Sequence, residues 1–473
     1  MAKGTLYYLI AAAVFVSSSY TIHIIIARHM GPALYGVFGI VLSVLSVSDL
    51  VVRGGIGKAV SKYVAEGKNQ FGILKAGLRL QLSVAAVVTF VYFMSAGSIA
   101  SLLGDKTLIL CMRISALCII PYALDSVYHG YLNGIRQFRR ESIASILYSL
   151  VKLGTVLTIV FTVSRVNEIF IAYAISACAS VVLARQFGHK FMKNADDTVL
   201  SVKQLAAFAI PVAIYCITEV LLMNTDIFLI KRILHDNALA GFYISASSLA
   251  RLPWYILGAF YMTLYPSISR AVSKGDMYLV KRYIRQSLRH LLIAIVPMAF
   301  IISISGRNLI QLFYSDAFAP ASSPLSVLIF GISLMAVFTS FTGVISASGK
   351  PSISLCLIVI LLPIAFGANL ILIPKYGLFG AAIASTFTYG VGVVVAGSFV
   401  FFKFGKCVSI LSVSRILIAS FAISFLLPRY PANGLMLFGA YLIAFCVYIG
   451  ILFITREITG EDINILKRML KPA

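Results

Sequence analysis

The sequence predicts an all-α polytopic membrane protein of about 14 transmembrane helices, arranged as two six-helix lobes and two further C-terminal helices. Three observations carry this prediction. Apolar stretches of the length that crosses a bilayer core, about 20 helical residues, follow one another along the chain. The mean hydropathy is +0.97 and charged residues make up 12% of the chain, about half of their share in soluble domains. Two pairs of loop motifs also recur at nearly the same spacing.

Hydropathy places the apolar spans one after another with short joining loops. The loops contain turn-forming pairs such as Gly31-Pro32 and Lys350-Pro351. The first span begins close to Met1 without a cleavage site after it, so we expect a retained helix. Short loops leave no room for a soluble catalytic domain. The predicted spans are 5–26, 34–52, 76–97, 107–128, 142–163, 167–184, 205–230, 238–265, 288–305, 323–346, 352–373, 377–400, 412–428 and 433–454.

The chain carries 39 Lys and Arg residues against 16 Asp and Glu, which gives a net charge of +23. In a soluble protein this excess suggests a nucleic-acid partner. Here an even number of spans places both termini on one side, and most basic residues lie on that side. Because basic loops face the cytoplasm, we predict a multi-pass protein of the cell membrane with cytoplasmic termini. Topology then explains the charge, and no nucleic acid is expected.

The chain contains a weak internal repeat. The segment 26–38 (IARHMGPALYGVF) resembles 230–243 (IKRILHDNALAGFY), and 128–138 (YHGYLNGIRQF) resembles 341–351 (FTGVISASGKP). Since each half holds an even number of spans, both halves insert the same way up, as in transporters that bind substrate between parallel repeats. We predict an N-terminal lobe at 1–200, a C-terminal lobe at 201–405, and helices 13 and 14 with a cytoplasmic tail at 406–473.

Catalytic and nucleotide-binding motifs are missing from the sequence. The six histidines are isolated, and the seven cysteines are scattered without a CxxC pair. We therefore predict no enzyme, no cofactor, no metal site and no disulfide framework. Without a nucleotide site, no energy can come from ATP bound by this chain.

Arg251, in SSLARLPWYILGAF, is the most informative of the ionisable residues deep in the predicted spans. Such residues are costly in a membrane and mark functional sites by default. Pro253 interrupts the helix two residues on, and a guanidinium can bind phosphate oxygens through two bonds. One interpretation makes Arg251 a diphosphate ligand in a central cavity. The other pairs it with Glu219, which is equally far from the turn near residue 235; the pair would then hold Arg251 until an anion competes.

Three further basic residues are candidates for the same cavity. Lys152 lies about half-way along the fifth span and has no acidic neighbour at helical spacing, which favours a water-filled cavity over a packed interface. Arg53 and Lys58 lie at the cytoplasmic end of the second span. All three are candidates, together with Arg251, for binding a diphosphate in that cavity.

Acidic residues in the spans have structural and functional interpretations. Asp49 and Arg53 are four residues apart, which predicts an ion pair on one helix face. Asp226 is followed by Lys231 and Arg232, which are close enough to neutralise it locally. Coupling to an ion is the alternative for these carboxylates. The candidates for coupling or for structural pairs are Glu219, Asp226 and Asp49.

The segment 269–290 is basic and amphipathic at helical spacing. Its basic residues include Lys281, Arg282, Arg285 and Arg289. Topology and attraction to anionic lipids explain these charges. The alternative is that they guide an anionic substrate to a gate.

Several stretches of the chain together resemble a known family. They are ARHMGPALYGVFGIVLSV at 27–44, HGYLNGIRQFRRESI at 129–143, the helix pair at 208–234 and 239–269, and LILIPKYGLFGAAIAST at 370–386. They resemble the multidrug/oligosaccharidyl-lipid/polysaccharide exporter superfamily, and within it the polysaccharide transporters, the Wzx-type lipid-linked oligosaccharide flippases.

The resemblance implies two lobes, helices 1–6 and 7–12, around a central cavity that opens alternately to each side. Helices 13 and 14 would be an addition, as in the lipid II flippase. That branch has an arginine in the segment that matches ARLPWYILG, so the resemblance makes Arg251 a candidate headgroup contact. The arginine-rich motif of its first helix is not matched before Arg28, which disfavours lipid II as the substrate.

We therefore expect a flippase that moves a polyprenyl-diphosphate-linked oligosaccharide from the cytoplasmic to the outer leaflet by alternating access, for surface polysaccharide or glycan biosynthesis. Its expected partners are this substrate and membrane lipids, with optional H⁺ or Na⁺ coupling, and it would act as a monomer. The alternative is a multidrug or organic-cation antiporter of the same superfamily. That function needs an acidic cavity, which the mixture of Arg251 and Lys152 with Glu219 disfavours.

Overall fold

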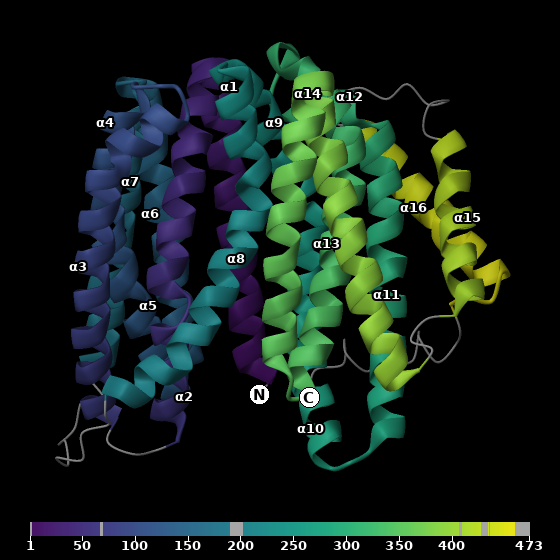
Figure 1. Cartoon of the computed structure of the whole chain (residues 1–473), viewed down its shortest axis with the longest axis horizontal. Coiled ribbons are helices and arrows are strands. Elements are labelled where there is room, and N and C mark those ends of the chain that lie inside the picture. The colour runs from purple at the N-terminus through teal and green to yellow at the C-terminus, as the bar shows by residue number, and fades with distance from the viewer. Residues whose placement is uncertain are drawn as a thin grey trace. The chain divides into compact units, whose positions relative to one another are not determined.

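The computed structural model describes residues 2–66, 70–189, 202–405, 409–426, 434 and 436–458. All regular structure in these residues is helical, as predicted. The chain forms two compact units, unit 1 (Met1–Gly241) and unit 2 (Phe242–Ala473), whose helices can be followed by colour in Figure 1. The lobes with boundaries at residues 200 and 405 were predicted from the sequence repeat, and they stay a prediction.

Unit 1 includes helix α8 (Val202–Leu234), which the prediction assigned to the C-terminal lobe. Helix α8 packs against α1 and α2, so the unit extends to Gly241. Its helices are α1 (Ala2–Arg53), α2 (Ile56–Ala65), α3 (Gln70–Leu102), α4 (Leu108–Ser115), the 3₁₀ helix η1 (Ala116–Cys118), α5 (Ile119–Gly134), α6 (Phe138–Thr162), α7 (Val166–His189) and α8 (Val202–Leu234), and α9 (Asn237–Ala250) begins in it.

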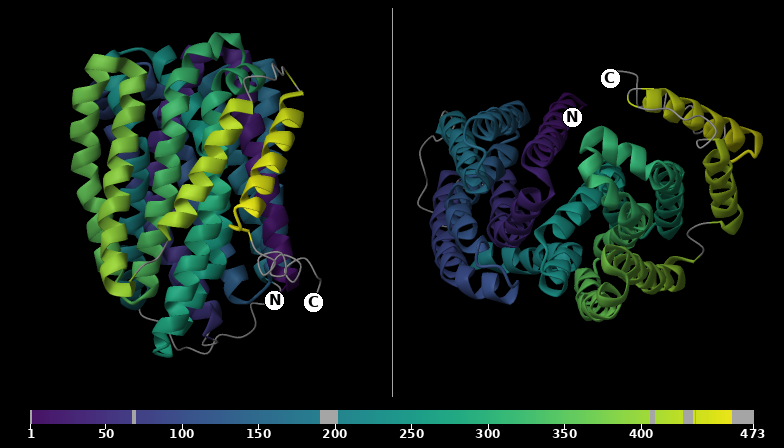
Figure 2. Two further views of the ribbon diagram at one scale, coloured as in Figure 1. Left: turned by 90° about the vertical axis from the view of Figure 1, so that its right-hand side faces the viewer. Right: turned by 90° about the horizontal axis from the view of Figure 1, so that it is seen from above.

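Unit 2 is built around α13 and the long helix α14, which pack along each other. Helices α15 and α16 lie side by side, yellow in Figure 2, and both contact α11. After α9 the helices are α10 (Leu252–Ser273), α11 (Met277–Ile304), α12 (Gly306–Phe313), the 3₁₀ helix η2 (Asp316–Ala321), α13 (Ser322–Ala347), α14 (Pro351–Phe404), α15 (Ile410–Leu426) and α16 (Met436–Ile454).

Two of the apolar segments are long enough to cross a membrane twice. Leu6–Ala65 has 60 residues and Pro351–Phe404 has 54, whereas one crossing takes about 20. Each bends at a glycine with positive φ, 77° at Gly31 and 57° at Gly377, a conformation that glycine adopts without steric cost. The fourteen predicted spans coincide with helices over their described residues, so the chain is an all-helical, multi-pass membrane protein.

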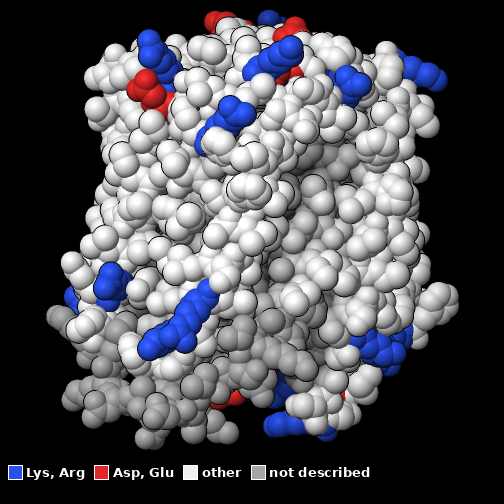
Figure 3. Space-filling view, turned by 60° about the vertical axis from the view of Figure 1, so that its left-hand side comes forward, with Lys and Arg blue, Asp and Glu red and all other residues white. Residues whose placement is uncertain are grey.

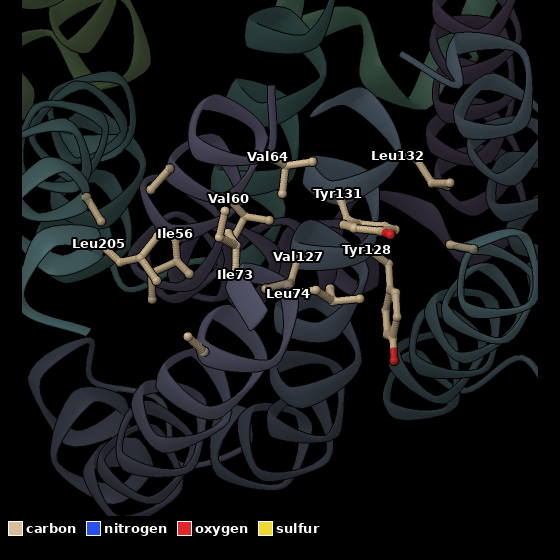
Figure 4. Close-up of a cluster of buried hydrophobic side chains, with 14 of the residues drawn as sticks. Ile56, Val60, Val64, Ile73, Leu74, Val127, Tyr128, Tyr131, Leu132 and Leu205 are labelled. Carbon is tan, nitrogen blue, oxygen red and sulfur yellow. The ribbon is translucent and has the colours of Figure 1, made fainter. Parts of the chain in front are cut away.

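The short helix α2 is an element that hydropathy did not predict. Ile56, Val60 and Val64 recur every four residues and form one buried face. This face packs against α3 and α5, where Ile73 and Tyr131 belong to the same buried cluster, as Figure 4 shows. The opposite side carries the exposed Lys58. Packing of its apolar face therefore holds α2 against unit 1 and fixes the position of Lys58.

Charged side chains are distributed as expected for a membrane protein. On the face seen in Figure 3, Lys, Arg, Asp and Glu lie toward the two ends, and uncharged residues cover the band between them. Uncharged side chains avoid the cost of placing ions in hydrocarbon. Charged groups inside the spans therefore need a specific explanation.

Candidate functional site

An open hollow of about 320 Å³ lies in unit 1, where α1 ends and where α2, α5 and α6 meet. Two predicted substrate-binding residues, Arg53 and Lys58, line it. The other lining residues are also polar or small. They are Gly57, Ser61, Ser126, His129, Gly130, Asn133 and Glu141. This concentration of charge within membrane-spanning segments makes the hollow the candidate site.

Two glycines allow the helices beneath the hollow to touch. A Cβ atom on Gly57 would lie 2.6 Å from the carbonyl oxygen of Ser126, and one on Gly130 would overlap the carbonyl oxygen of Gly57. Only glycine at both positions lets the backbones of α2 and α5 approach this closely. The crossing brings Lys58 and His129, each a neighbour of one glycine in sequence, to the same hollow.

Arg53 is held by two carboxylates of its own unit. Its Nε lies 2.7 Å from Asp49 Oδ1, and its Nη1 lies 3.7 Å from Asp125 Oδ2. The guanidinium also stacks 4.1 Å from the centre of the Tyr122 ring. The predicted pair of Asp49 and Arg53 is therefore confirmed. The charge of Arg53 is thus balanced by these carboxylates where it lines the hollow. Lys58 also lines the hollow, and its side chain is exposed.

A hydrogen-bonded group that the sequence did not predict lies beside the hollow, and two of its members, His129 and Glu141, line it. His129 Nε2 lies 3.3 Å from Asp125 Oδ1, and its Nδ1 lies 3.9 Å from Glu141 Oε1. Ser180 donates to Asp125 over 2.6 Å. Tyr8, from the first turns of α1, donates to Glu141. The group thus joins residues of α1, α5, α6 and α7.

The prediction that every histidine is isolated was wrong for His129. Its spacing from Asp125, four residues on one helix, was the available signal. The sequence gave no sign that Glu141 belongs to this group, because its partner Tyr8 is 133 residues away along the chain. Within the described ranges, His, Cys, Asp and Glu side chains form no group suited to a metal ion. The group can instead exchange protons or order polar ligands.

Lys152 lies in the packed interior of unit 1, and its side chain is 4% exposed. The ammonium donates to Ser19 Oγ over 3.2 Å. It lies 4.9 Å from the ring centre of Phe15, 5.1 Å from that of Tyr148 and 5.3 Å from that of Tyr173. The expected water-filled cavity around Lys152 is therefore wrong: aromatic rings surround it. Among the residues described, no carboxylate contacts it.

Lys231, one of the two residues expected to neutralise Asp226, pairs elsewhere. Its Nζ lies 2.8 Å from Asp105 Oδ2 and 2.7 Å from Asn237 Oδ1. Asp226 is buried and accepts a bond from the backbone N–H of Ile227. The local pairing with Lys231 was thus wrong, because the loop between α3 and α4 supplies Asp105 as a competing carboxylate.

Arg251 stands at a break between two helices. It is the residue between the end of α9 and Leu252, the first residue of α10, so the interruption expected near Pro253 is confirmed. Its side chain is half-buried. Glu219 lies in α8. Because Glu219 belongs to unit 1 and Arg251 to unit 2, their predicted pairing stays a prediction.

Comparison with known proteins agrees with this architecture. The chain is 22% identical over 388 residues to the lipid II flippase MurJ of Bacillus subtilis, covering 73% of this chain and 71% of that protein. It is 21% identical over 388 residues to the probable low-salt glycan biosynthesis flippase Agl15 of Haloferax volcanii, covering 80% and 79%.

A solved structure shares the fold. The structure of the lipid II flippase MurJ in an inward closed conformation covers 96% of this chain and 99% of its own, with a TM-score of 0.79 and 14% identity. A family model described as polysaccharide biosynthesis protein matches residues 25–323, more than half of the chain. These relatives are transporters and not enzymes. The chain therefore belongs to the polysaccharide biosynthesis protein family, whose relatives include flippases.

Proposed function

We propose that this protein carries a polyprenyl-diphosphate-linked oligosaccharide from the cytoplasmic to the outer leaflet by alternating access, with both termini cytoplasmic. The family and the flippases among its relatives support this proposal. Contacts with the diphosphate and glycan are assigned to Arg251, Lys152, Arg53 and Lys58. Coupling to H⁺ or Na⁺ is assigned to Glu219, Asp226 and Asp49, and the protein acts as a monomer.

The burial of the charged Lys152 side chain among aromatic rings is the observation that carries the proposal. A buried ammonium that contacts no carboxylate of the described residues, as here, costs free energy in a membrane. Its neighbours Ser19 and Phe15 come from α1, while Tyr148 and Tyr173 come from α6 and α7. A movement of α1 away from α6 would uncover a positive charge among aromatic faces. Such a surface suits a diphosphate and the apolar faces of sugar rings.

The membrane potential could drive this transport without a coupled ion. Moving one elementary charge across 100 mV corresponds to about 2.3 kcal/mol. A headgroup with a charge of about −2 that leaves a negative cell interior would gain roughly 4–5 kcal/mol. Ion coupling is therefore an addition to the mechanism and not a requirement.

Replacement of Lys152 separates a functional role from a structural one. Lys152→Met keeps the length and removes the charge, so the variant should fold as well as the parent protein or better, because a desolvation cost disappears. Transport should nevertheless fall at least about tenfold, the loss expected when a charge-assisted bond of about 1.5 kcal/mol disappears. Surface glycan and accumulated lipid-linked precursor, in cells that depend on this protein, measure transport.

The matched control is Lys75→Met, because Lys75 lies exposed on α3 of the same unit. Protein level in the membrane is measured for both variants. Unchanged glycan export by Lys152→Met at normal protein level would exclude Lys152 from the transport path. Lys152→Arg, which keeps the charge, should retain more export than Lys152→Met.

Organic-cation export is the second candidate function, and the carboxylates in and beside the hollow favour it. Glu141 lines the hollow together with Arg53 and Lys58, and Asp49 and Asp125 lie beside Arg53. Efflux of a cationic dye from vesicles, driven by a proton or sodium gradient, tests this function. Dye efflux that Glu141→Gln abolishes would favour the antiporter over the flippase.

A further inference from the structure

The described residues that line the hollow of unit 1 carry polar groups almost throughout. Two of the nine, Gly57 and Gly130, are glycines, and each of the other seven has a polar side chain. Pockets that bind small molecules are usually lined mainly by apolar and aromatic side chains. A prenyl chain would find no apolar side chain in this lining, whereas a ligand rich in hydroxyl groups would find hydrogen-bonding partners around it.

Glu141 has one carboxylate oxygen that the described residues leave without a hydrogen bond. Its Oε2 accepts from the Tyr8 hydroxyl and, over 3.4 Å, from Asn133 Nδ2. Its Oε1 lies 3.9 Å from His129 Nδ1, which is longer than a hydrogen bond. Glu141 is only 9% exposed, and a buried acceptor that stays unpaired costs free energy. Oε1 therefore suits a ligand that donates to it.

A hydroxyl group fits between Glu141 Oε1 and His129 Nδ1. An oxygen atom about 2.8 Å from each of them, a usual hydrogen-bond length, is compatible with their separation of 3.9 Å. The hydroxyl would donate to the carboxylate, and it would accept from the ring nitrogen when that nitrogen carries a proton. Both residues line the hollow, so a ligand there can place a hydroxyl at this point.

Other side chains of the lining offer acceptors and donors to neighbouring hydroxyls. Ser61 donates to Asn133 Oδ1 over 2.8 Å, and Ser126 donates to the backbone oxygen of Ala123 over 3.0 Å. Each serine thus uses its only hydroxyl hydrogen inside the protein and keeps oxygen lone pairs that can accept. The exposed Lys58 ammonium supplies donors. Sugar hydroxyls both donate and accept, which matches this mixed lining.

The size and charge of the hollow favour a single sugar ring over a phosphate. Its volume of about 320 Å³ is at the small end of ligand pockets, about 300–1,000 Å³, so it suits one ring and not a whole oligosaccharide. A phosphate would bring negative charge towards the Glu141 carboxylate, and like charges repel. Arg53 offers little compensation, because Asp49 and Asp125 already pair with its guanidinium.

We infer that the hollow binds one sugar residue of the lipid-linked glycan, with one sugar hydroxyl shared by Glu141 and His129. The source of the sugar rests on the proposed function, whereas the preference for hydroxyls over phosphate rests on the lining. Arg53 and Lys58 then contact the glycan, and the diphosphate is bound outside the hollow. Because the shared hydroxyl must point between two fixed side chains, Glu141 and His129 help to select the glycan.

Acetylation of Lys58 in the full-length protein tests this inference. Lys58 is exposed in the hollow, so a bound sugar should shield its ammonium from an acetylating reagent. The probe is the oligosaccharide that mild acid releases from the lipid-linked precursor of cells that depend on this protein. It lacks the prenyl chain and the diphosphate, and inorganic pyrophosphate is the second probe. Mass spectrometry of the purified protein in detergent compares the acetylation rate of Lys58 with that of Lys75, which is exposed on α3.

The oligosaccharide should slow acetylation of Lys58 and leave that of Lys75 unchanged, and pyrophosphate should need a higher concentration for the same effect. Glu141→Gln should raise the concentration of oligosaccharide that gives half-protection about tenfold, the effect of losing a charge-assisted bond. Glu66→Gln is the matched control, because Glu66 is exposed at the end of α2, and it should change nothing. Ser126→Ala, which leaves the bonds of Glu141 in place, should give a smaller rise and replaces Glu141→Gln if the unfolding temperature of that variant falls.

Three results would overturn the inference. The first is no protection of Lys58 by the oligosaccharide, and the second is equal protection in the parent and in a correctly folded Glu141→Gln. The third is protection by pyrophosphate at the lower concentration of the two probes, which would make the hollow a phosphate site. Failure of the proposed function shows separately, since the free oligosaccharide would protect Lys58 although loss of the protein leaves glycan export unchanged. Export that depends on the protein, without protection of Lys58, would refute the sugar site alone.

Discussion

Lys231 Nζ lies 2.8 Å from Asp105 Oδ2, and both side chains are almost fully buried, with 2% and 9% of their surface exposed. Asn237 closes the group, since its Nδ2 donates to the same Asp105 oxygen over 2.8 Å. The loop between α3 and α4 is thereby tied to the junction of α8 and α9.

Asp105→Asn should destabilise the protein by about 3 kcal/mol or more, because Lys231 would keep a buried charge without a carboxylate. Lys231→Met in the same chain should recover part of the loss, since both charges are then absent. Thermal unfolding in detergent measures both variants. The matched control is Asp276→Asn, an exposed cap of α11. Additive losses in the double variant would contradict the pairing.

The contribution of Asp105 should be independent of pH near neutrality and fall only in acid. Burial acts to raise the pKa of its carboxyl, but bonds from Lys231 and other donors outweigh burial and lower the pKa from 3.8 to about 2. A lowered pKa stabilises the folded state above the unfolded value, and this effect disappears as the pH falls from about 4 to 2. The stability difference between the parent and Asp105→Asn should follow this course. A difference that changes between pH 5 and 8 would point to another group.

Gly36→Ala should destabilise unit 1 by about 1–3 kcal/mol, the usual cost of overpacking. A Cβ atom there would lie 2.9 Å from Gly241 N and overlap the carbonyl oxygen of Asn237. The contact is reciprocal, because a Cβ on Gly241 would lie 3.1 Å from Gly36 N. Gly97→Ala is the control, since nothing lies within 4 Å of its Cβ position. Equal unfolding temperatures of Gly36→Ala and the parent would show that the helices can separate freely.

Arg53→Gln and Lys58→Gln should differ, although both residues line the hollow. Arg53→Gln should cost about 2 kcal/mol of stability, because Asp49 and Asp125 lose their shared cation. Lys58→Gln changes an exposed side chain, so its effect on stability should stay within about 0.5 kcal/mol. If Lys58 meets the substrate, glycan export should still fall in Lys58→Gln. Full export by that variant would leave Lys58 outside the transport path.

The reciprocal contact of Gly36 and Gly241 also supports the proposed repeat. These glycines belong to the matching segments 26–38 and 230–243, and the structure brings them together in unit 1. When two symmetry-related segments contact each other, each presents the same kind of group to its partner. Here the carbonyl oxygen of Pro32 lies against Gly241, and the carbonyl oxygen of Asn237 lies against Gly36. The sequence could reveal the match but not the contact.

The sequence by itself determined the features that depend on neighbours along the chain. Apolar length set the spans, the glycines at 31 and 377 set the bends, and Pro253 set the break beside Arg251. The pair of Asp49 and Arg53 also followed, because four residues make one helical turn.

Only the tertiary structure decided which charges are matched. Asp105 and Lys231 are 126 residues apart, and Lys152 and Ser19 are 133 residues apart. Hydropathy shows that a charge lies in a span, but the side chains that surround it come from other helices. The aromatic surroundings of Lys152 and the carboxylates beside His129 therefore depend on how the helices pack.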